Sequence, residues 1–480
     1  MTTRRALAFS FLDRYLGLII GIASSMVIAR VLTPAEIGTY SVVMVLLGFM
    51  ATLRDLGAGQ YMVQHRSLDT PSLRAIWTVQ LGLGLLFAIL TLASSSWVAQ
   101  FYGDARMREI MYVLALNFAV TPFLASPNAW LVREMHFGVL SIVRSTGALT
   151  HAGVAIGLAL LGWGPISLAY ANLATTIAGV IVIRLVSDAQ MPGRPGLHGI
   201  RDVVSFGGRL TAVSLIDTVR AGSPELLLGR IQGLASAGLF SRGMGLVSMF
   251  QQLVLSAVGA VALPYFARES REGRPLGPSF VLSVELITGL GWPFFGGLVL
   301  LAYPAMRILY GDQWDAAVEP TRWLAIAAAI SLPALICSAP MIAASALNDM
   351  LKASALSMTL SLVAVTAGAQ HGLTVLAQLL AVAALFSSAY WLWLAKKRLK
   401  FEWPQFALAT LRSVKLTVAT LVAPILTVFS LGWTPDNVWL ACLVAIPGAV
   451  LGFLFTARLL QHALWAEIQR FVQAQLQRFK

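Results

Sequence analysis

The sequence is poor in charged residues. Only 11% of its 480 residues are Asp, Glu, Lys or Arg, against 58% hydrophobic residues, and the mean hydropathy is +0.78. So few charged groups cannot cover the surface of a water-soluble globule of this length. The composition therefore excludes a soluble globular protein and predicts a chain that lies in a bilayer.

Cysteine and histidine are scarce as well. Cys337 and Cys442 each lie inside an apolar run, so neither a disulfide framework nor a thiolate metal site is expected. The six histidines are scattered along the chain. We therefore expect no metal and no cofactor.

Apolar runs long enough to cross a bilayer, about 17 to 25 residues each, recur about fourteen times. They start near Phe9, Gly38, Ala75, Ile110, Leu140, Pro165, Val204, Ala237, Phe280, Thr321, Ala353, Leu373, Val414 and Val438. Clusters of Gly and Pro such as "MPGRPG" and "GWTPDN" separate several of them. The sequence thus predicts an all-α integral membrane protein with about 14 transmembrane helices.

Basic residues gather on one side of this arrangement. With the amino terminus in the cytoplasm, 22 of the 34 Lys and Arg residues fall in the even-numbered connections and the two termini, and six fall on the opposite side. This asymmetry predicts that both termini are cytoplasmic. The net charge of +13 is then mostly a matter of topology, and nucleic acid is not an expected partner.

Two stretches near the middle and the start of the chain are similar to each other. "ARVLTPAEIGTYS" at residues 29–41 has a faint copy, "GRIQGLASAGLFS", from Gly229. "FYGDARMREIMYVLA" and "LYGDQWDAAVEPTRWLA" form a second pair in the same order. Displacements of about 200 and 208 to 211 residues indicate duplication. We expect six-helix bundles at residues 1–200 and 201–396, related by an axis along the membrane normal.

The last segment, residues 397–480, lies outside this repeat. It is predicted to hold two additional transmembrane helices and a cytoplasmic tail. The tail sequence "LWAEIQRFVQAQLQRF" repeats apolar residues at helical spacing, which favours a helix along the cytoplasmic membrane surface. A partner-binding helix is the alternative.

Four stretches together resemble the polysaccharide-repeat-unit flippases. They are "ARVLTPAEIGTYSVV", "LRDLGAGQYMVQ", "LVREMHFGVLSIVRSTGAL" and "ILYGDQWDAAVEPTRWLA". That family shares a superfamily with multidrug and toxin extrusion (MATE) transporters and lipid II flippases, so the resemblance implies a MATE-like fold.

The resemblance also implies a function. It suggests that the chain moves undecaprenyl-diphosphate-linked oligosaccharide repeat units across the bacterial inner membrane, for O-antigen, capsule or exopolysaccharide synthesis. Expected partners are this lipid-linked glycan, membrane lipids, and a polysaccharide polymerase with its chain-length regulator. The chain would then not be an enzyme.

Arginine residues inside the predicted spans are the candidate ligands for the diphosphate. A charged side chain at a helix centre costs about 2.5 to 3.5 kcal/mol and needs a partner or a wet cavity. All six embedded bases are Arg, which binds phosphate oxygens in a bidentate manner. The candidate set is Arg14, Arg54, Arg220 and Arg242. Escape of Arg54 to the cytoplasmic interface is the alternative.

Small and polar residues at steps of three or four could line a hydrated path between the bundles. The candidates are Asp13, Gly17 and Ser24 on the first helix, and Ser241, Ser248 and Gln252 on the eighth. Close packing of helices explains such stripes equally well.

Asp217 is the candidate ion-coupling residue, because it lies near a span centre beside Arg220. A simple neutralising ion pair with Arg220 is the alternative. The neighbours Arg54 and Asp55 are expected to point in different directions on their helix.

Two rival functions remain open. A drug exporter of the same superfamily would favour an acidic or aromatic pocket for cations, and the embedded bases, six against five acids, argue against it modestly. A membrane polymerase or glycosyltransferase would need a sizeable loop bearing acids or His, whereas the outer connections are short.

Reporter fusions test the predicted orientation. Because of the Lys and Arg asymmetry, fusions after Ser67, Arg271 and Arg398 should report the cytoplasm, and fusions near Asp104, Asp312 and Asp436 the outer side. An inverted pattern at all six points would contradict this topology.

Overall fold

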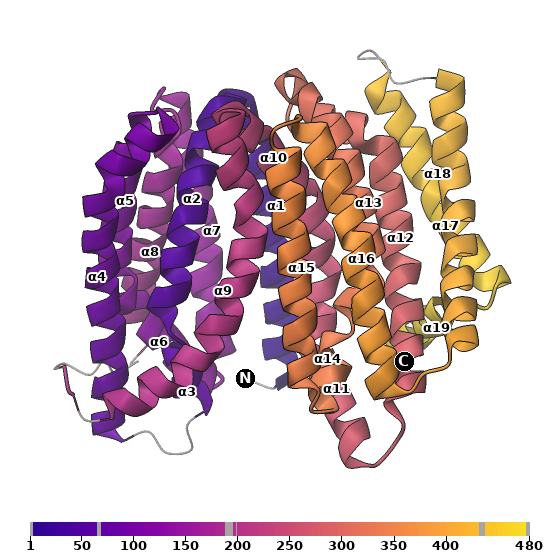
Figure 1. The fold of residues 1–480 in the computed structure, drawn as a ribbon, viewed down its shortest axis with the longest axis horizontal. Coiled ribbons are helices and arrows are strands. Elements are labelled where there is room, and N and C mark those ends of the chain that lie inside the picture. Colours follow the sequence, from indigo (N-terminus) through magenta and orange to yellow (C-terminus); the bar gives the residue numbers. More distant parts are fainter. Residues whose placement is uncertain (1–2, 65–68, 188–194, 198, 432–436, 477–480) are drawn as a thin grey trace. The chain divides into compact units, whose positions relative to one another are not determined.

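A computed structural model describes residues 3–64, 69–187, 195–197, 199–431 and 437–476 of the chain. Within these residues the secondary structure is entirely helical (Figure 1). Contacts divide the chain into two compact units, Met1–Gly238 and Leu239–Lys480. The division is based on contacts between residues. It does not test the boundaries at residues 200 and 396 that the sequence repeat predicts, and these stay predictions.

The first unit contains nine helices in the described residues and the start of a tenth. They are α1 (Thr3–Val31), α2 (Pro34–Asp55), α3 (Ala58–Gln64), α4 (Thr70–Tyr102), α5 (Arg106–Val120), α6 (Pro122–Arg133), α7 (Phe137–Leu160), α8 (Ile166–Val186), α9 (Ile200–Ile231) and the beginning of α10 (Leu234–Phe250). The helix α9, which was expected to open the second bundle, packs against α2 and α4 in this unit.

The second unit continues α10 through a short π-helix into a further set of helices. They are η1 (Gln251–Leu255), α11 (Ser256–Arg271), α12 (Leu276–Leu309), the 3₁₀ turn η2 (Asp312–Ala317), α13 (Val318–Leu335), α14 (Ser338–Ala343), α15 (Leu347–Gly368), α16 (Leu373–Leu399), α17 (Trp403–Leu431), α18 (Val438–Leu459) and α19 (Ala463–Leu476).

The chain is an integral, multi-pass membrane protein. Ten helical segments of the described residues are long and apolar enough to cross a bilayer, or eleven if α5 and α6, which meet at a bend of 45°, count as one span. Each predicted run starts inside a helix or, at Pro165, one residue before it, but the count of fourteen spans is not confirmed. The helix α9 is not among the ten segments. Asp217, Arg220 and Glu225 lie in its central part and lower its hydropathy.

The repeated stretch at residues 29–41 builds the start of α2. Thr33 and Glu36 form a capping box, in which the Thr33 hydroxyl accepts from the Glu36 amide at 3.3 Å and the Glu36 carboxylate accepts from the Thr33 amide at 2.9 Å. Such caps contribute about 1 kcal/mol. Thr39, one turn later, donates to Asp104 at 2.8 Å. Burial opposes ionisation of Asp104, but hydrogen bonds from Arg106 and Thr39 outweigh it and lower the pKa of Asp104.

Two glycines of the repeat meet at a reciprocal contact. A Cβ on Gly38 would collide with the carbonyl oxygen of Leu234, and a Cβ on Gly238 would collide with the carbonyl oxygen of Pro34. Both pairs are displaced by 200 residues, so the contact repeats itself about a local twofold axis. Only glycine fits there, which explains why this residue occurs in both copies.

The backbone repeats other features. Gly103 and Gly311, displaced by 208 residues, both have a positive φ, of 73° and 102°, but their ψ angles of 22° and −179° differ. Met135 and Ser345, displaced by 210 residues, both have a φ of 56°, which is uncommon for residues other than glycine. The shared left-handed φ of Met135 and Ser345 supports the predicted duplication.

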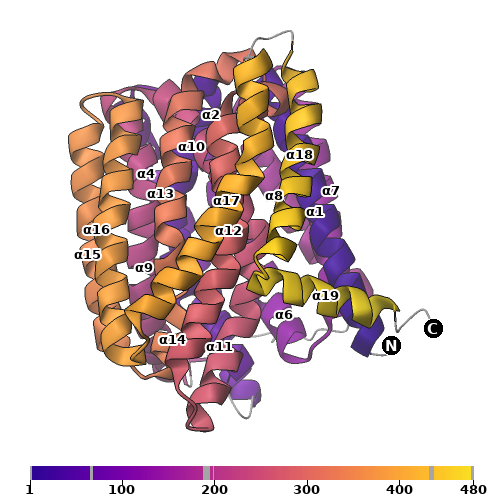
Figure 2. The same cartoon turned by 90° about the vertical axis from the view of Figure 1, so that its right-hand side faces the viewer.

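The carboxyl-terminal helices are attached to the second unit by a buried polar cluster. Figure 2 shows α19 leaving the end of α18 at a steep angle, and α19 packs against α12 and α18. His462 is fully buried just before α19, with its Nε2 3.3 Å from the Ser413 hydroxyl and 4.0 Å from the Glu285 carboxylate. Burial lowers the pKa of His462. Whether α19 lies on a membrane surface stays a prediction.

Gly38→Ala tests the reciprocal contact. Because the added methyl group would meet backbone rather than a movable side chain, we expect a loss of about 1 to 3 kcal/mol in stability, seen as a lower thermal midpoint in detergent. The matched control is Gly82→Ala on α4, where a Cβ has no neighbour within 4 Å. An equal midpoint for the two variants would show that the contact is not tight.

Candidate functional site

The first unit contains a cavity of about 580 Å³ near the end that holds the connections between α2, α3 and α4. This volume lies in the range typical of small-ligand pockets, about 300 to 1,000 Å³. The cavity lies among α2, α3, α4, α6 and α9. Its lining residues are Thr52, Asp55, Gly57, Gly59, Gln60, Val63, Gln80, Ala125, Ala129, Val132, Thr211 and Ser214.

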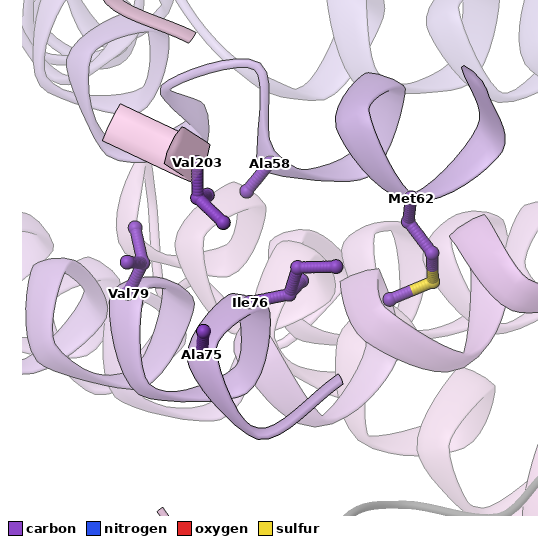
Figure 3. Close-up of a cluster of buried hydrophobic side chains, with 6 residues drawn as sticks. All are labelled: Ala58, Met62, Ala75, Ile76, Val79 and Val203. Atoms are coloured by element: carbon purple, nitrogen blue, oxygen red, sulfur yellow. The ribbon is translucent and has the colours of Figure 1, made fainter. Parts of the chain in front are cut away.

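The short helix α3 separates the cavity from an apolar cluster. Ala58 and Met62 pack into a group of buried side chains that also includes Ala75, Ile76, Val79 and Val203 (Figure 3). Gly59, Gln60 and Val63 lie on the cavity side of the same helix. Arg133 of α6 donates to the Met62 carbonyl at 2.6 Å. The apolar cluster and this bond therefore hold α3 in place as one wall of the cavity.

Hydroxyl and amide groups dominate the polar lining. Gln80 of α4 accepts from Ser126 of α6 at 2.5 Å, which fixes the amide of Gln80 at the cavity wall. The Thr52 hydroxyl of α2 lies 3.2 Å from the Thr218 hydroxyl of α9. Groups of this kind both donate and accept hydrogen bonds. The cavity is therefore suited to a neutral ligand rich in hydroxyl groups.

The charged pair beside the cavity corrects one expectation. Arg54 and Asp55 do not point apart, because the Arg54 guanidinium donates to the Asp55 carboxylate at 3.0 and 2.6 Å. The helix α2 ends at Asp55, and Leu56 has a left-handed φ of 34°, so the last turn leaves Asp55 free to turn back. Arg54 also lies over the ring of Phe118, 5.4 Å from its centroid. The pair gives the cavity rim little net charge.

Arg220 and Asp217 lie on α9 away from this cavity. Nine residues, or 2.5 helical turns, separate Thr211 from Arg220, so the two point to opposite sides of α9. The Arg220 Nε is 3.8 Å from Asp217, and both side chains are exposed, by 45% and 66%. This is a loose pair on an exposed part of α9, and the roles of both residues in binding and coupling stay predictions.

Arg242 belongs to the second unit. Its guanidinium lies over the rings of Tyr310 and Trp314, at 5.3 and 5.6 Å from their centroids, and both rings are buried. The aromatic faces stabilise the charge by cation–π interaction. The guanidinium of Arg242 is thus occupied by contacts within the protein in this structure.

The remaining candidates are only partly described. The side chains of Asp13 and Arg14 lie outside the described residues. Ser24 is buried, and a Cβ added to Gly17 would have no neighbour within 4 Å. In the second unit, Ser248 donates to the Gly245 carbonyl at 2.8 Å, while Ser241 is half-buried and Gln252 is exposed. Their role in lining a path stays a prediction.

A smaller cavity of about 340 Å³ occupies the repeat-equivalent place in the second unit. Gly259 and Leu263 line it where Gly59 and Val63 line the first cavity, each displaced by 200 residues. Leu255 takes the place of Asp55. The duplicated cavities have therefore diverged, and the first one carries most of the polar groups.

The residues that the sequence prediction missed are the neutral polar ones: Gln60, Gln80, Thr211 and Ser214. A search for embedded charge does not find them. For Thr211 and Ser214, the signal that could have found them is their spacing with Thr218 along one face of α9.

Comparison with known proteins gives a family match. The family described as "polysaccharide biosynthesis protein" matches residues 27–319. Among curated proteins, the chain is 25% identical to the succinoglycan biosynthesis transport protein ExoT of Rhizobium meliloti, over 64% of this chain and 62% of ExoT. It is 21% identical to the lipopolysaccharide biosynthesis protein WzxC of Escherichia coli, over 64% of this chain and 63% of WzxC. The chain thus matches less than two thirds of the length of these relatives.

Solved structures establish the fold type. The chain is similar to the lipid II flippase MurJ in an inward closed conformation, with a TM-score of 0.76, 11% identity, and coverage of 95% of this chain and 99% of MurJ. It is also similar to an inward-facing MATE family multidrug resistance transporter, with a TM-score of 0.66, 12% identity, and coverage of 80% and 94%. The predicted MATE-like fold is confirmed.

Removal of single polar groups tests the cavity. We expect Gln60→Leu and Thr211→Val each to reduce function about two- to tenfold, because a hydrogen bond contributes about 0.5 to 1.5 kcal/mol. Protein abundance in the membrane should be unchanged. The control is Thr366→Val on α15, whose hydroxyl only bonds back to its own helix. Equal function of all three variants would exclude this cavity as the binding site.

Proposed function

Because the chain belongs to the polysaccharide biosynthesis protein family, we propose that it is a flippase for lipid-linked oligosaccharide repeat units. It moves the glycan headgroup from the cytoplasmic to the outer leaflet of the bacterial inner membrane while the lipid tail stays in the bilayer. The product serves the synthesis of a surface or secreted polysaccharide.

The cavity of the first unit, with its hydroxyl and amide groups, is the observation that carries this proposal. It presents hydroxyl and amide groups from four helices, fixed at Gln80 by the bond from Ser126. A sugar offers many hydroxyl groups and no charge at most positions, so binding it calls for such neutral donors and acceptors. The names of the relatives, a succinoglycan transport protein and a lipopolysaccharide biosynthesis protein, agree with a glycan substrate.

The same cavity argues against the drug-exporter alternative. A pocket for organic cations needs an available acid or an open aromatic face. The acid of this cavity, Asp55, is already hydrogen-bonded to Arg54. The aromatic rings of Tyr310 and Trp314 in the second unit are already covered by Arg242.

The diphosphate is assigned to arginines outside the cavity. Arg220 is the best supported of the four candidates, since its guanidinium is 45% exposed and its pairing with Asp217 at 3.8 Å is loose. Phosphate oxygens could replace that carboxylate in a bidentate contact. Arg14 would add to this site, while Arg54 and Arg242 would first have to leave their present partners.

Translocation would proceed by alternating access, as in other transporters built from repeats along the membrane normal. Translocation makes and breaks no covalent bond, so no enzymatic step is assigned. Both termini would be cytoplasmic. The polymerase and the chain-length regulator would act on the product.

Arg220→Ala tests the site together with the function. In cells that lack the native gene, this variant should abolish polymer export and leave lipid-linked repeat units in the membrane. Arg220→Lys should restore only part of the export, because a point charge cannot reproduce the planar fork of Arg. Immunoblots of membranes should show wild-type amounts of both variants.

Two outcomes would contradict these roles. Full export by the Ala variant would remove Arg220 from the site. Loss of export together with loss of protein would show a structural ion pair with Asp217 instead. Wild-type export in the complete absence of the protein would contradict the flippase itself.

A further inference from the structure

Glu225 is an acid in α9 to which neither the cavity nor the diphosphate site gives a role. One of its carboxylate oxygens, Oε2, is buried and has no hydrogen-bond partner in the part of the chain that the structure describes. An ionised carboxylate without a partner is costly to bury within a membrane protein. Burial without a partner therefore favours the protonated form of this carboxyl group.

Among the described residues, the helices that pack against α9 supply no compensating base to this part of it. The helix α2, which packs against this part of α9, has no ionisable residue between Tyr40 and Arg54. The helix α4 brings Tyr102, whose hydroxyl donates to the Leu226 carbonyl at 3.4 Å. The helix α3, which also touches α9, packs near its opposite end, at Val203.

The two bases of α9 nearest to Glu225 in sequence, Arg220 and Arg230, lie beside other groups. Arg220 pairs with Asp217, and Arg230 lies over the ring of Phe101, 5.0 Å from its centroid. The repeat-equivalent residue of Glu225 on α1, displaced by 200 residues, is Ser25. The acid is thus specific to the second copy and is not inherited from the scaffold.

Glu225 also lies where a proline interrupts the backbone hydrogen bonds of α9. Pro224 precedes it, and a proline inside a helix removes one backbone hydrogen bond and favours a kink. The Arg220 carbonyl, left without that bond, accepts from the Ser223 hydroxyl at 3.3 Å. A charge that appears at Glu225 would act on a helix whose backbone hydrogen bonding is interrupted there.

Close packing on both sides makes this position sensitive to charge. A Cβ on Gly222 would collide with Val45 of α2, and a Cβ on Gly229 would approach Val42 at 2.8 Å. Glu225 lies between these two glycines along α9, and its position eleven residues after Ser214 places it on the cavity-facing side of the helix. A carboxylate there would draw water in and separate α9 from α2.

From these observations we propose that Glu225 is a proton-binding site whose ionisation opens the α2–α9 contact and so couples sugar-lipid translocation to a proton gradient. This assignment rests on the proposed flippase function. Asp217, the candidate from the sequence, is 66% exposed, so its ionisation would change the environment of α9 far less. Protonation of Glu225 favours the packed form, and release of the proton favours the separated form.

The test uses the purified full chain in lipid vesicles with a fluorescent undecaprenyl-diphosphate oligosaccharide. An imposed pH gradient, acidic on the side of the outer loops, should accelerate wild-type translocation by about fivefold or more. Glu225→Gln should still translocate without a gradient and should lose the acceleration. Asp202→Asn, an exposed acid in the first turn of α9, is the matched control and should behave as wild type.

A second readout does not depend on transport. Infrared titration of the purified protein should show the carbonyl band of a protonated buried carboxyl group at neutral pH, absent from Glu225→Gln and retained in Asp217→Asn. Retention of the band or of the acceleration by Glu225→Gln would overturn the proposal, as would loss of acceleration in Asp217→Asn alone. If even the wild type does not translocate, the flippase function fails, while the infrared band still decides whether Glu225 holds a proton.

Discussion

A charged side chain inside a bilayer must be neutralised, and this constraint organises the polar interior of the protein. Arg54 is neutralised by Asp55 and supported by the ring of Phe118. Arg242 is held by two buried aromatic rings. Once these charges are satisfied internally, the polar groups left to face the first cavity are neutral, and they suit a sugar better than an ion. Glu225, which has no such partner in the described residues, satisfies the same constraint by holding a proton.

The duplication supplies the scaffold on which these groups are placed. The stretch that begins at residue 29 forms a capping box and a glycine contact, which hold α2 in place. Function is expected where the copies differ. Asp55 corresponds to Leu255 at the two cavities, and Glu225 corresponds to Ser25 on the equivalent helices. A membrane protein built from two similar halves could in this way keep its packing while one half acquires polar function.

The sequence predicts the fold well because apolar runs, and the Gly and Pro clusters between them, are local signals. Long apolar runs, the repeat and the short motifs lead to a MATE-like helical protein, which the structural comparison confirms. The site was harder to predict, since the positions of charged residues indicate neither where a cavity lies nor which side chains pair. Gln60 and Gln80 look ordinary in the sequence and become wall residues only through the packing of α3 and α4. The bond between Arg54 and Asp55 depends on the end of α2 at Asp55, which no periodicity reveals.

The central claim is that this chain moves a lipid-linked glycan between leaflets. Its most direct test is the accessibility of a labelled undecaprenyl-diphosphate oligosaccharide in vesicles that contain the purified protein, measured with an impermeant glycosidase added outside. The account predicts that the inner-leaflet half of the label becomes cleavable over time, and that it stays protected in vesicles without protein. Protection of that half in both preparations would contradict the account.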